Sequence, residues 1–352
     1  MVLNKKFWEN KSVLITGHSG FKGGWLSLLL SELGARVHGY SLAPITCPSL
    51  FSVLELQNRI HTSTFGDILD YRSLKNALKE VEPEVIFHMA AQPLVRESYK
   101  SPFETFQTNV IGTINILEAS RLVNSTQAFV NVTTDKCYDN KGPSLPYRES
   151  DRLGGNDPYS ASKACSELVT SAYRTSFLEK SNLHIATVRA GNVIGGGDWA
   201  QDRLIPDILR SIDSGQKLKL RYPEAIRPWQ HVLEPLSGYL MLAEKLYNEG
   251  KSFAEAWNFG PNKENECTVG LVVKKLSGHF PNLEWEPDSS SLPRESDVLK
   301  LDSSKAKSLL GWTPQWSLCT AIEKTADWYK SWLKKEDMYA VTSSQFNSYF
   351  CS

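Results

Sequence analysis

The sequence predicts an α/β protein with a doubly wound parallel sheet of the Rossmann type and a smaller, mostly C-terminal lobe. Two observations support this fold class. Apolar segments of strand length alternate six times with segments of helical periodicity, as in parallel sheets covered by helices on both faces. The first strand, residues 13–15, runs into glycines spaced G-x-x-G-x-x-G and then into a helix. This arrangement is typical of a site for the pyrophosphate of a dinucleotide.

The glycine turn comprises Gly17, Gly20 and Gly23. We expect Gly17 to permit a tight turn, Gly20 to let a phosphate approach the backbone, and Gly23 to let the helix and strand pack closely. The spacing differs from the commoner G-x-G-x-x-G, and His18 stands where a small residue is expected. The helix should end at Gly34, a C′ residue. A plain structural turn is the alternative interpretation.

The remaining elements follow in order. Further strands are expected at residues 36–40, 61–64, 85–87, 128–132 and 184–188. Helices are expected at residues 71–79, 103–123, 158–177, 204–212, 236–246, 304–310 and 318–332, and the last dozen residues should fray. We assign residues 1–190, with a returning segment near 254–260, to a dinucleotide-binding domain. Residues 191–352 form the expected substrate-binding lobe, and the ligand should lie at the carboxyl ends of the strands.

The composition argues against several classes of protein. The 352 residues include 39 Lys+Arg and 39 Asp+Glu, and this zero formal charge leaves no broad footprint for nucleic acid or anionic membranes. The six cysteines form no C-x-x-C pair or zinc-like cluster with histidine, so we expect free thiols in a reducing compartment and no metal site. No apolar run approaches the ~20 residues of a membrane span, and the start lacks a signal-peptide pattern. A cytoplasmic protein is expected.

Tyr159 and Lys163 are the first candidates for chemistry. Their i, i+4 spacing places both side chains on one helix face. Tyrosine has a free pKa of about 10, and a lysine cation beside it favours the tyrosinate that can accept a proton from a sugar hydroxyl. Y-x-x-x-K alone is common by chance and also fits an ordinary exposed helix. Behind a glycine turn, and with Thr134 at the end of the preceding strand, it predicts an oxidoreductase-type site.

Several motifs together resemble the extended short-chain dehydrogenase/reductase superfamily: T-G-H-S-G-F-K-G, T-T-D-K-C-Y and Y-S-A-S-K. Within its NAD-dependent epimerase/dehydratase family, G-F-K-G-G-W-L, D-K-C-Y, G-G-G-D-W-A-Q-D-R-L-I-P-D and R-P-W-Q-H-V-L-E-P are similar to those of the CDP-glucose 4,6-dehydratases. The resemblance covers nearly the whole chain. It implies NAD as cofactor, held by Gly17, Gly20, Phe21, Gly23, Asp67, Ala90, Ala91, Tyr159 and Lys163. The second strand ends in Tyr40-Ser41 without a ribose-binding carboxylate, so that position does not decide between NAD and NADP.

The same resemblance implies dehydration of a CDP-sugar in deoxysugar and O-antigen biosynthesis. Tyr159 takes the proton of the sugar 4-hydroxyl while a hydride leaves C4, Lys163 holds the nicotinamide ribose, and Thr134 hydrogen-bonds the 4-oxygen. Water is then lost across C5 and C6, and the hydride returns to C6. Asp135 and Lys136 would supply the acid and base that elimination needs, where the dTDP-glucose enzymes carry Asp-Glu. The alternative for this pair is a local ion pair at a strand end.

Substrate contacts are also implied by the resemblance. Arg227 and Arg294 would clamp the diphosphate, for which the planar guanidinium is suited, and Asn192, Asp202 and Arg203 would face the sugar nucleotide. Any single arginine is more often a solvated surface residue, and recognition of cytosine depends on the resemblance alone.

Rival interpretations remain at this stage. They are a nucleotide-sugar 4-epimerase or decarboxylase of the same superfamily, and a non-catalytic dinucleotide sensor. Phe103, Phe106, Val110, Ile114 and Leu117 form an apolar stripe on the expected 103–123 helix. With the 159–177 helix this stripe suggests a homodimer or homotetramer, and packing within the monomer is equally compatible.

Overall fold

The computed structural model describes residues 3–140, 142, 145–179, 181–288 and 298–350. Its centre is a seven-stranded parallel sheet with the strand order β10-β6-β5-β4-β1-β2-β3. The strands are β1 (Ser12–Thr16), β2 (Arg36–Ser41), β3 (Thr62–Phe65), β4 (Val85–His88), β5 (Ala128–Val132), β6 (His184–Ala190) and β10 (Ala256–Phe259). All six strands expected in the first half are present, and the predicted fold class is confirmed.

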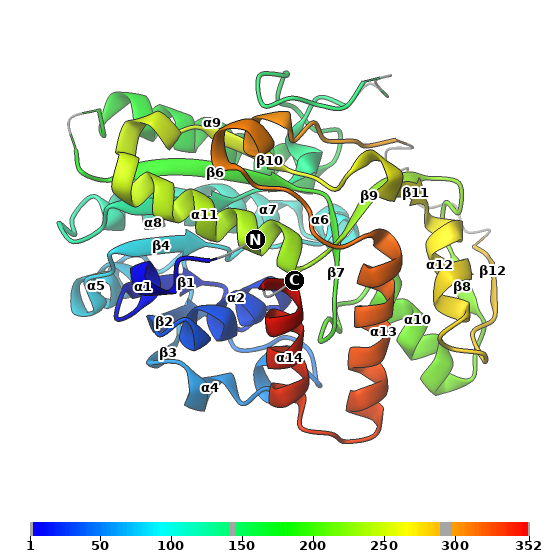
Figure 1. Cartoon of the computed structure of the whole chain (residues 1–352). Coiled ribbons are helices and arrows are strands. Elements are labelled where there is room, and N and C mark those ends of the chain that lie inside the picture. Colours follow the sequence, from blue (N-terminus) through cyan, green and yellow to red (C-terminus); the bar gives the residue numbers. More distant parts are fainter. Residues whose placement is uncertain (1–2, 141, 143–144, 180, 289–297, 351–352) are drawn as a thin grey trace.

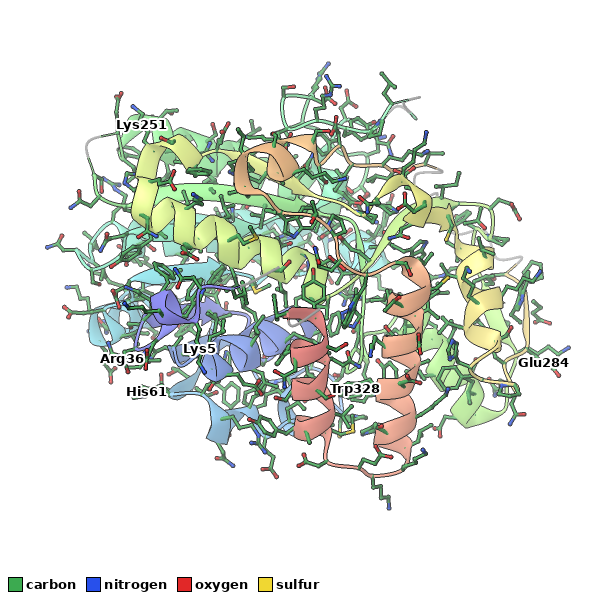
Figure 2. The ribbon with its side chains drawn as sticks, in the orientation of Figure 1. Lys5, Arg36, His61, Lys251, Glu284 and Trp328 are labelled. Carbon is green, nitrogen blue, oxygen red and sulfur yellow. The ribbon has the colours of Figure 1, made fainter. Side chains whose placement is uncertain are left out.

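Helices cover both faces of the sheet because successive side chains of each strand point to opposite faces. Val13 and Ile15 of β1 pack in one hydrophobic cluster, whereas Leu14 packs in another. The first cluster is covered by α2 (Phe21–Glu32), α11 (Leu233–Glu249) and α14 (Met338–Phe350); the second by α5 (Tyr71–Val81), α8 (Gly112–Ser120) and α9 (Pro158–Ser176) (Figure 1). Arg36, Lys251 and Glu284 lie on the outside, and Trp328 lies in the interior (Figure 2).

A second group of strands and helices, called the lobe below, lies beyond the ends of the central strands, at the right of Figure 1. A three-stranded sheet has the order β11-β9-β7, and β12 pairs with β8. These strands are β7 (Asn192–Ile194), β8 (Leu218–Leu220), β9 (Ile226–His231), β11 (Glu266–Thr268) and β12 (Trp285–Pro287). The helices here are α10 (Leu204–Ser214), α12 (Val269–Ser277) and α13 (Leu318–Leu333).

Shorter helical segments connect these elements. They are α1 (Lys5–Trp8), α3 (Leu50–Val53), α4 (Leu56–Arg59), α6 (Val95–Lys100), α7 (Pro102–Phe106), η1 (Gln107–Ile111), η2 (Asp135–Cys137), η3 (Gly250–Phe253), η4 (Lys263–Asn265) and η5 (Ala306–Leu310). The expected helix 103–123 is therefore α7, a π-helical turn η1 and α8 in succession.

The apolar stripe predicted on that helix is exposed at Phe103 and Phe106 but buried at Leu117. Phe103 and Phe106 are 67% and 37% exposed, whereas Thr105, Asn109 and Thr113 are buried. These polar side chains are satisfied by hydrogen bonds, for example from Asn109 Nδ2 to Ser162 Oγ. Polar residues thus form the inner face of the first half of this segment, which an apolar count along the sequence could not detect.

Contrary to expectation, the described part of the last dozen residues does not fray. Residues 338–350 form α14, and Phe346 packs edge-on against Trp25 of α2 with ring centroids 5.4 Å apart. Ser343 Oγ donates to Glu32 Oε1, the end of the same helix. No helix in the described part of the chain combines the length and apolar character of a membrane-spanning segment.

Candidate functional site

The glycine turn between β1 and α2 has the close backbone packing that its sequence predicts. Gly17 has φ +79°, and a Cβ on Gly17 would lie 2.8 Å from the Ala90 nitrogen at the end of β4. A Cβ on Gly23 would lie 2.1 Å from the Gly17 carbonyl oxygen, so only glycine fits there. A Cβ on Gly20 would meet only that oxygen, at 3.4 Å, which leaves this side of the turn open. The turn fits a dinucleotide pyrophosphate approaching the N-terminus of α2.

His18 is fully buried within this turn and points toward β2 and β3. Its Nε2 lies 2.8 Å from Ser63 Oγ, and its Nδ1 lies 3.0 Å from Ser41 Oγ. A Cβ on Gly39 would lie 2.3 Å from the ring, so glycine in β2 makes room for the imidazole. Burial lowers the His18 pKa to about 4, so the ring is neutral near pH 7.

The end of β5 carries the Thr134-Asp135-Lys136 segment. The Thr134 hydroxyl accepts from the Lys136 backbone amide and donates to Asp135 Oδ1 at 3.1 Å, which begins the short η2 turn. Asp135 is 4% exposed, and its Oδ2 has no hydrogen-bond partner among the described residues. Burial raises the pKa of Asp135, against the opposing charges of Lys136, Arg227 and Lys22. The carboxyl is thereby biased toward the protonated form that a general acid needs.

Tyr159 and Lys163 lie on the first turns of α9, which begins after Asp157, whose side chain caps the helix. Burial raises the Tyr159 pKa to about 12, although a hydrogen bond with Thr134 and the charge of Arg203 lower it. Lys163 Nζ donates to the Val132 carbonyl at 3.1 Å. Burial, and next the charge of Lys22, lower the Lys163 pKa to about 8.

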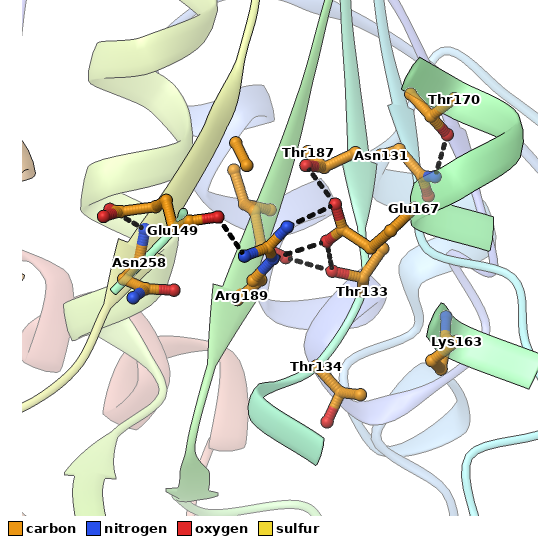
Figure 3. A network of polar contacts seen from close by, with 12 residues as sticks. Asn131, Thr133, Thr134, Glu149, Lys163, Glu167, Thr170, Thr187, Arg189 and Asn258 are labelled. Atoms are coloured by element: carbon orange, nitrogen blue, oxygen red, sulfur yellow. Dashed lines mark hydrogen bonds and ion pairs between the residues drawn. The ribbon is translucent and has the colours of Figure 1, made fainter. Parts of the chain in front are cut away.

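A buried polar network behind these residues fixes the strand ends (Figure 3). Arg189 of β6 binds Glu167 of α9 in bidentate fashion, with Nε–Oε1 at 2.8 Å and Nη2–Oε2 at 2.9 Å. Thr133 and Thr187 donate to the same carboxylate, and Arg189 also donates to the Tyr138 hydroxyl. Residues on both sides of the Thr134-Asp135-Lys136 segment are therefore held by one ion pair.

One cleft brings together most of the residues predicted to act on a substrate. Its lining includes Phe21, Thr134, Asp135, Lys136, Tyr159, Asn192, Asp202, Arg203 and Arg227. Lys163 and the glycines of the turn lie outside this lining, and so do Asp67, Ala90 and Ala91. Asp67 follows β3 and accepts from the Leu69 amide. Arg294 lies outside the described residues.

The cleft also contains charged residues that sequence reasoning missed. Lys22, Arg96, Asp198 and Arg221 line it, and isolated charges of this kind carry no spacing signal in a sequence. Asp198 is 6% exposed and binds Arg203, with Nη1–Oδ2 at 3.0 Å. Among the residues that the structure describes, seven lysines and arginines and four aspartates line the cleft. Since the whole chain has zero formal charge, positive charge is concentrated here, as a polyanionic ligand requires.

A family model described as GDP-mannose 4,6 dehydratase matches residues 14–325. The chain belongs to the GDP-mannose 4,6-dehydratase family. The resemblance inferred from the motifs is confirmed by a relative in the same group of nucleotide-sugar dehydratases. The CDP-glucose 4,6-dehydratase of Salmonella typhimurium is 50% identical and is aligned over 99% of this chain and 98% of its own.

More distant relatives of this dehydratase family agree. A dTDP-glucose 4,6-dehydratase of Xanthomonas campestris pv. campestris is 29% identical over 90% of this chain and 92% of its own. A crystal structure of a DesIV double mutant, a dTDP-glucose 4,6-dehydratase from Streptomyces venezuelae with NAD and DAU bound, has a TM-score of 0.75 and 25% identity. It covers 93% of this chain and 99% of that one. MoeE5 in complex with UDP-glucose and NAD has the same fold, with a TM-score of 0.76, 22% identity, and coverage of 92% and 99%.

Proposed function

We propose that this protein is a hydro-lyase that converts CDP-glucose to CDP-4-keto-6-deoxyglucose with NAD as a resident cofactor. The observation that carries the proposal is the placement of Thr134, Asp135, Lys136 and Tyr159 in one positively charged cleft. The 50% identity with a CDP-glucose 4,6-dehydratase over nearly the full length supports the nucleotide and the sugar. A product of this kind belongs to deoxysugar biosynthesis, including that of O-antigens, in the cytoplasm.

The glycine turn and the adjacent strand ends would hold NAD. The pyrophosphate would lie against Gly17, Gly20, Phe21 and Gly23. Asp67 would contact the adenine, and Ala90 and Ala91 would lie along the cofactor. Tyr159 and Lys163 would face the nicotinamide end. When bound there, NAD would supply the hydride transfer, taking the hydride from C4 of the sugar and giving it back at C6. We propose residues 1–190, with the returning segment near 254–260, as the part that holds this cofactor and the rest of residues 191–352 as the sugar-nucleotide lobe.

Tyr159 removes the proton of the 4-hydroxyl during oxidation. The Tyr159 pKa of about 12 must be lowered before the hydroxyl can act as a base near pH 7. Arg203 lowers this pKa in the protein itself, and the positive nicotinamide ring would add to the effect. Thr134, which hydrogen-bonds Tyr159, steadies the 4-oxygen as it becomes a ketone.

Asp135 and Lys136 carry the elimination. The 4-ketone acidifies the C5 proton, Lys136 accepts it, and the protonated carboxyl of Asp135 gives its proton to the departing C6 hydroxyl as water. A 4-epimerase returns hydride to C4 and needs neither group. A non-catalytic sensor has no use for Tyr159, Lys163 and Thr134 together.

Arg227 would bind the nucleotide diphosphate, with Arg294 as a further cation, and Asn192 and Arg203 would face the sugar nucleotide. Arg227 is 5% exposed and lines the cleft from β9, where its register partner is Cys267 of β11. A nearly buried guanidinium in water-poor surroundings binds phosphate more strongly than an exposed one.

We also propose that a second copy of the chain covers the exposed apolar face of α7 and α9, giving a homodimer. Phe103, Leu168 and Phe177 are 67%, 59% and 53% exposed. Their exposure in one molecule would be unfavourable in water. Light scattering should give twice the monomer mass, and Phe103→Asp with Leu168→Asp should give the monomer.

The deciding experiment is incubation of the purified protein with CDP-glucose and NAD. Mass spectrometry should find a product lighter by one water, and NADH should not accumulate in proportion to it. UDP-glucose and dTDP-glucose serve as comparison substrates. A product of unchanged mass would indicate an epimerase, and no product from any of the three would favour a sensor.

A further inference from the structure

Three charged residues meet at the cleft without a part in the chemistry proposed above. Arg96 belongs to α6 in the sheet half, Arg221 follows β8 in the lobe, and Asp202 lies just before α10. Arg96 Nη1 lies 2.6 Å from Asp202 Oδ1, and Arg221 Nη1 lies 3.4 Å from the same oxygen. Two guanidinium groups from different parts of the fold therefore share one carboxylate oxygen.

The backbone around Asp202 is also engaged in this contact. Arg221 Nη2 donates to the Asp202 carbonyl at 3.1 Å. Asp202 has φ +61°, a left-handed conformation that residues other than glycine seldom adopt, although Asp and Asn tolerate it. The chain thus accepts an unusual backbone conformation at the residue that presents this oxygen.

A phosphate group can replace the Asp202 carboxylate as the partner of these two arginines. The side chains of Arg96, Asp202 and Arg221 are 34%, 27% and 20% exposed, and partly exposed ion pairs contribute little to stability. A phosphate group offers more acceptor oxygens than one carboxylate, and arginine binds it with two parallel hydrogen bonds. Asp207 lies 3.5 Å from Arg221 and is paired with Arg210, so Arg221 keeps an anionic neighbour during an exchange.

We propose that Arg96 and Arg221 form a phosphate site for the nucleoside diphosphate and that the Asp202 carboxylate occupies this site until the ligand displaces it. This inference rests on the proposed function for its ligand class, a nucleoside diphosphate, and it changes the expected role of Asp202. Asp202 is a competitor of the phosphate and not a contact to the sugar nucleotide. Binding then replaces the bridge between α6 and the lobe by a bridge through the ligand.

The direction in which one substitution changes the affinity for CDP tests the inference. Asp202→Asn removes the competing charge, so the Kd for CDP should fall about two- to fivefold. Asn suits the left-handed backbone, and Asp202→Gly provides a second variant that also does. Asp213→Asn is the control, because it removes the same charge from an exposed position of α10 outside the cleft lining.

Isothermal titration should use CDP, UDP and cytidine. The gain should appear with CDP and UDP and be absent with cytidine, which has no phosphate. Arg96→Gln and Arg221→Gln should each weaken CDP binding roughly tenfold or more, and the gain from Asp202→Asn should vanish in the Arg96→Gln protein. The melting temperature of each variant verifies folding.

The possible results separate this inference from the proposed function. Unchanged or weaker CDP binding by both Asp202 variants would overturn the inference, because Asp202 would then be a bystander or a ligand contact. A gain for CDP and UDP alike would support it even if CDP-glucose were not dehydrated. In that case only the proposed substrate and reaction would fail.

Discussion

Arg203 Nη1 lies 3.0 Å from Asp198 Oδ2, in the same cleft as the hydroxyl of Tyr159. Asp198 is itself held by Tyr329 of α13, whose hydroxyl accepts from the Asp198 amide at 3.0 Å and donates to its carbonyl at 2.6 Å. Through the Arg203–Asp198 ion pair, α13 therefore holds the Arg203 cation near Tyr159, the expected base. Since the charge of Arg203 lowers the Tyr159 pKa, it should affect the oxidation step.

Arg203→Gln should therefore shift the acidic limb of the kcat profile to higher pH. Without the cation the Tyr159 pKa rises, and a higher pH is needed for the same fraction of tyrosinate. The measurement is kcat against pH, so that altered substrate binding does not enter. Arg210→Gln, a similar change outside the cleft lining, is the control. An unshifted limb would show that Arg203 only binds substrate.

Lys136→Ala should separate the two halves of the reaction. The variant should bind CDP-glucose and transfer the first hydride, because oxidation at C4 depends on Tyr159. It should fail to exchange solvent deuterium into C5, with a loss of roughly a hundredfold or more, as expected for a missing general base. Lys219→Ala removes another lysine of the cleft lining as a control. Exchange at the wild-type rate would make Lys136 an ion-pair partner and leave Asp135, acting through a water, as the candidate base.

Gly23→Ala and Gly20→Ala should have different effects. A methyl group at Gly23 would lie 2.1 Å from the Gly17 oxygen, so the backbone must move, and we expect a loss of roughly 3 kcal/mol of unfolding free energy. At Gly20 the contact is 3.4 Å, so stability should change by less than about 1 kcal/mol. NAD binding should nevertheless weaken in Gly20→Ala, because the methyl group obstructs the phosphate. Urea denaturation and NADH fluorescence titration measure the two effects, and equal destabilisation by both substitutions would contradict the packing argument.

Glu234 should make stability depend on pH. It is buried at the start of α11, accepts from the Trp316 amide and the Tyr349 hydroxyl, and burial raises its pKa to about 7. A carboxyl whose pKa is raised by folding binds more protons in the native state, so stability is lost as pH rises from about 4.5 to 7. His231, with a pKa lowered by burial to about 3, stays neutral over this range.

Glu234→Gln should therefore match the wild type near pH 5 and exceed its unfolding free energy by roughly 2–3 kcal/mol at pH 8. Urea denaturation at both values measures the difference. Glu249→Gln, on the exposed end of the same helix, should show no such divergence. A wild type that is the more stable protein at pH 8 would mean that the hydrogen bonds favour the ionised form.

The parts of the fold and site that local sequence determines were predictable. Val13 and Ile15 are buried on one face of the sheet and Leu14 on the other, as the apolar run predicts for a parallel strand. The turn from Gly17 to Gly23 is determined largely by residues that are neighbours in the sequence. The meeting of Arg96, Asp202 and Arg221 depends on contacts between segments 106 and 19 residues apart, which no sequence motif encodes.

The polarity of the sequence did not predict which residues are buried in the 103–123 segment and at the C-terminal helix. Thr105, Asn109 and Thr113 are buried because Gln92, Ser162 and Ser166 supply their hydrogen bonds, and those partners come from other elements. An apolar count along the sequence placed Phe103 in the stripe and left open whether a second copy or the same molecule packs against it. The C-terminal helix escaped prediction because its apolar residues follow no marked stripe, although Phe346 and Tyr349 are buried.

The contact of α14 with α2 has a consequence for synthesis on the ribosome. Trp25 belongs to the helix that begins at the glycine turn, yet its ring partner Phe346 lies in α14 and is translated long after it. The N-terminal layer can therefore form its strands and helices early, as nascent domains do, but it lacks part of its covering until α14 has been translated. A polypeptide stalled before residue 338 would therefore expose the apolar side of α2 to chaperones.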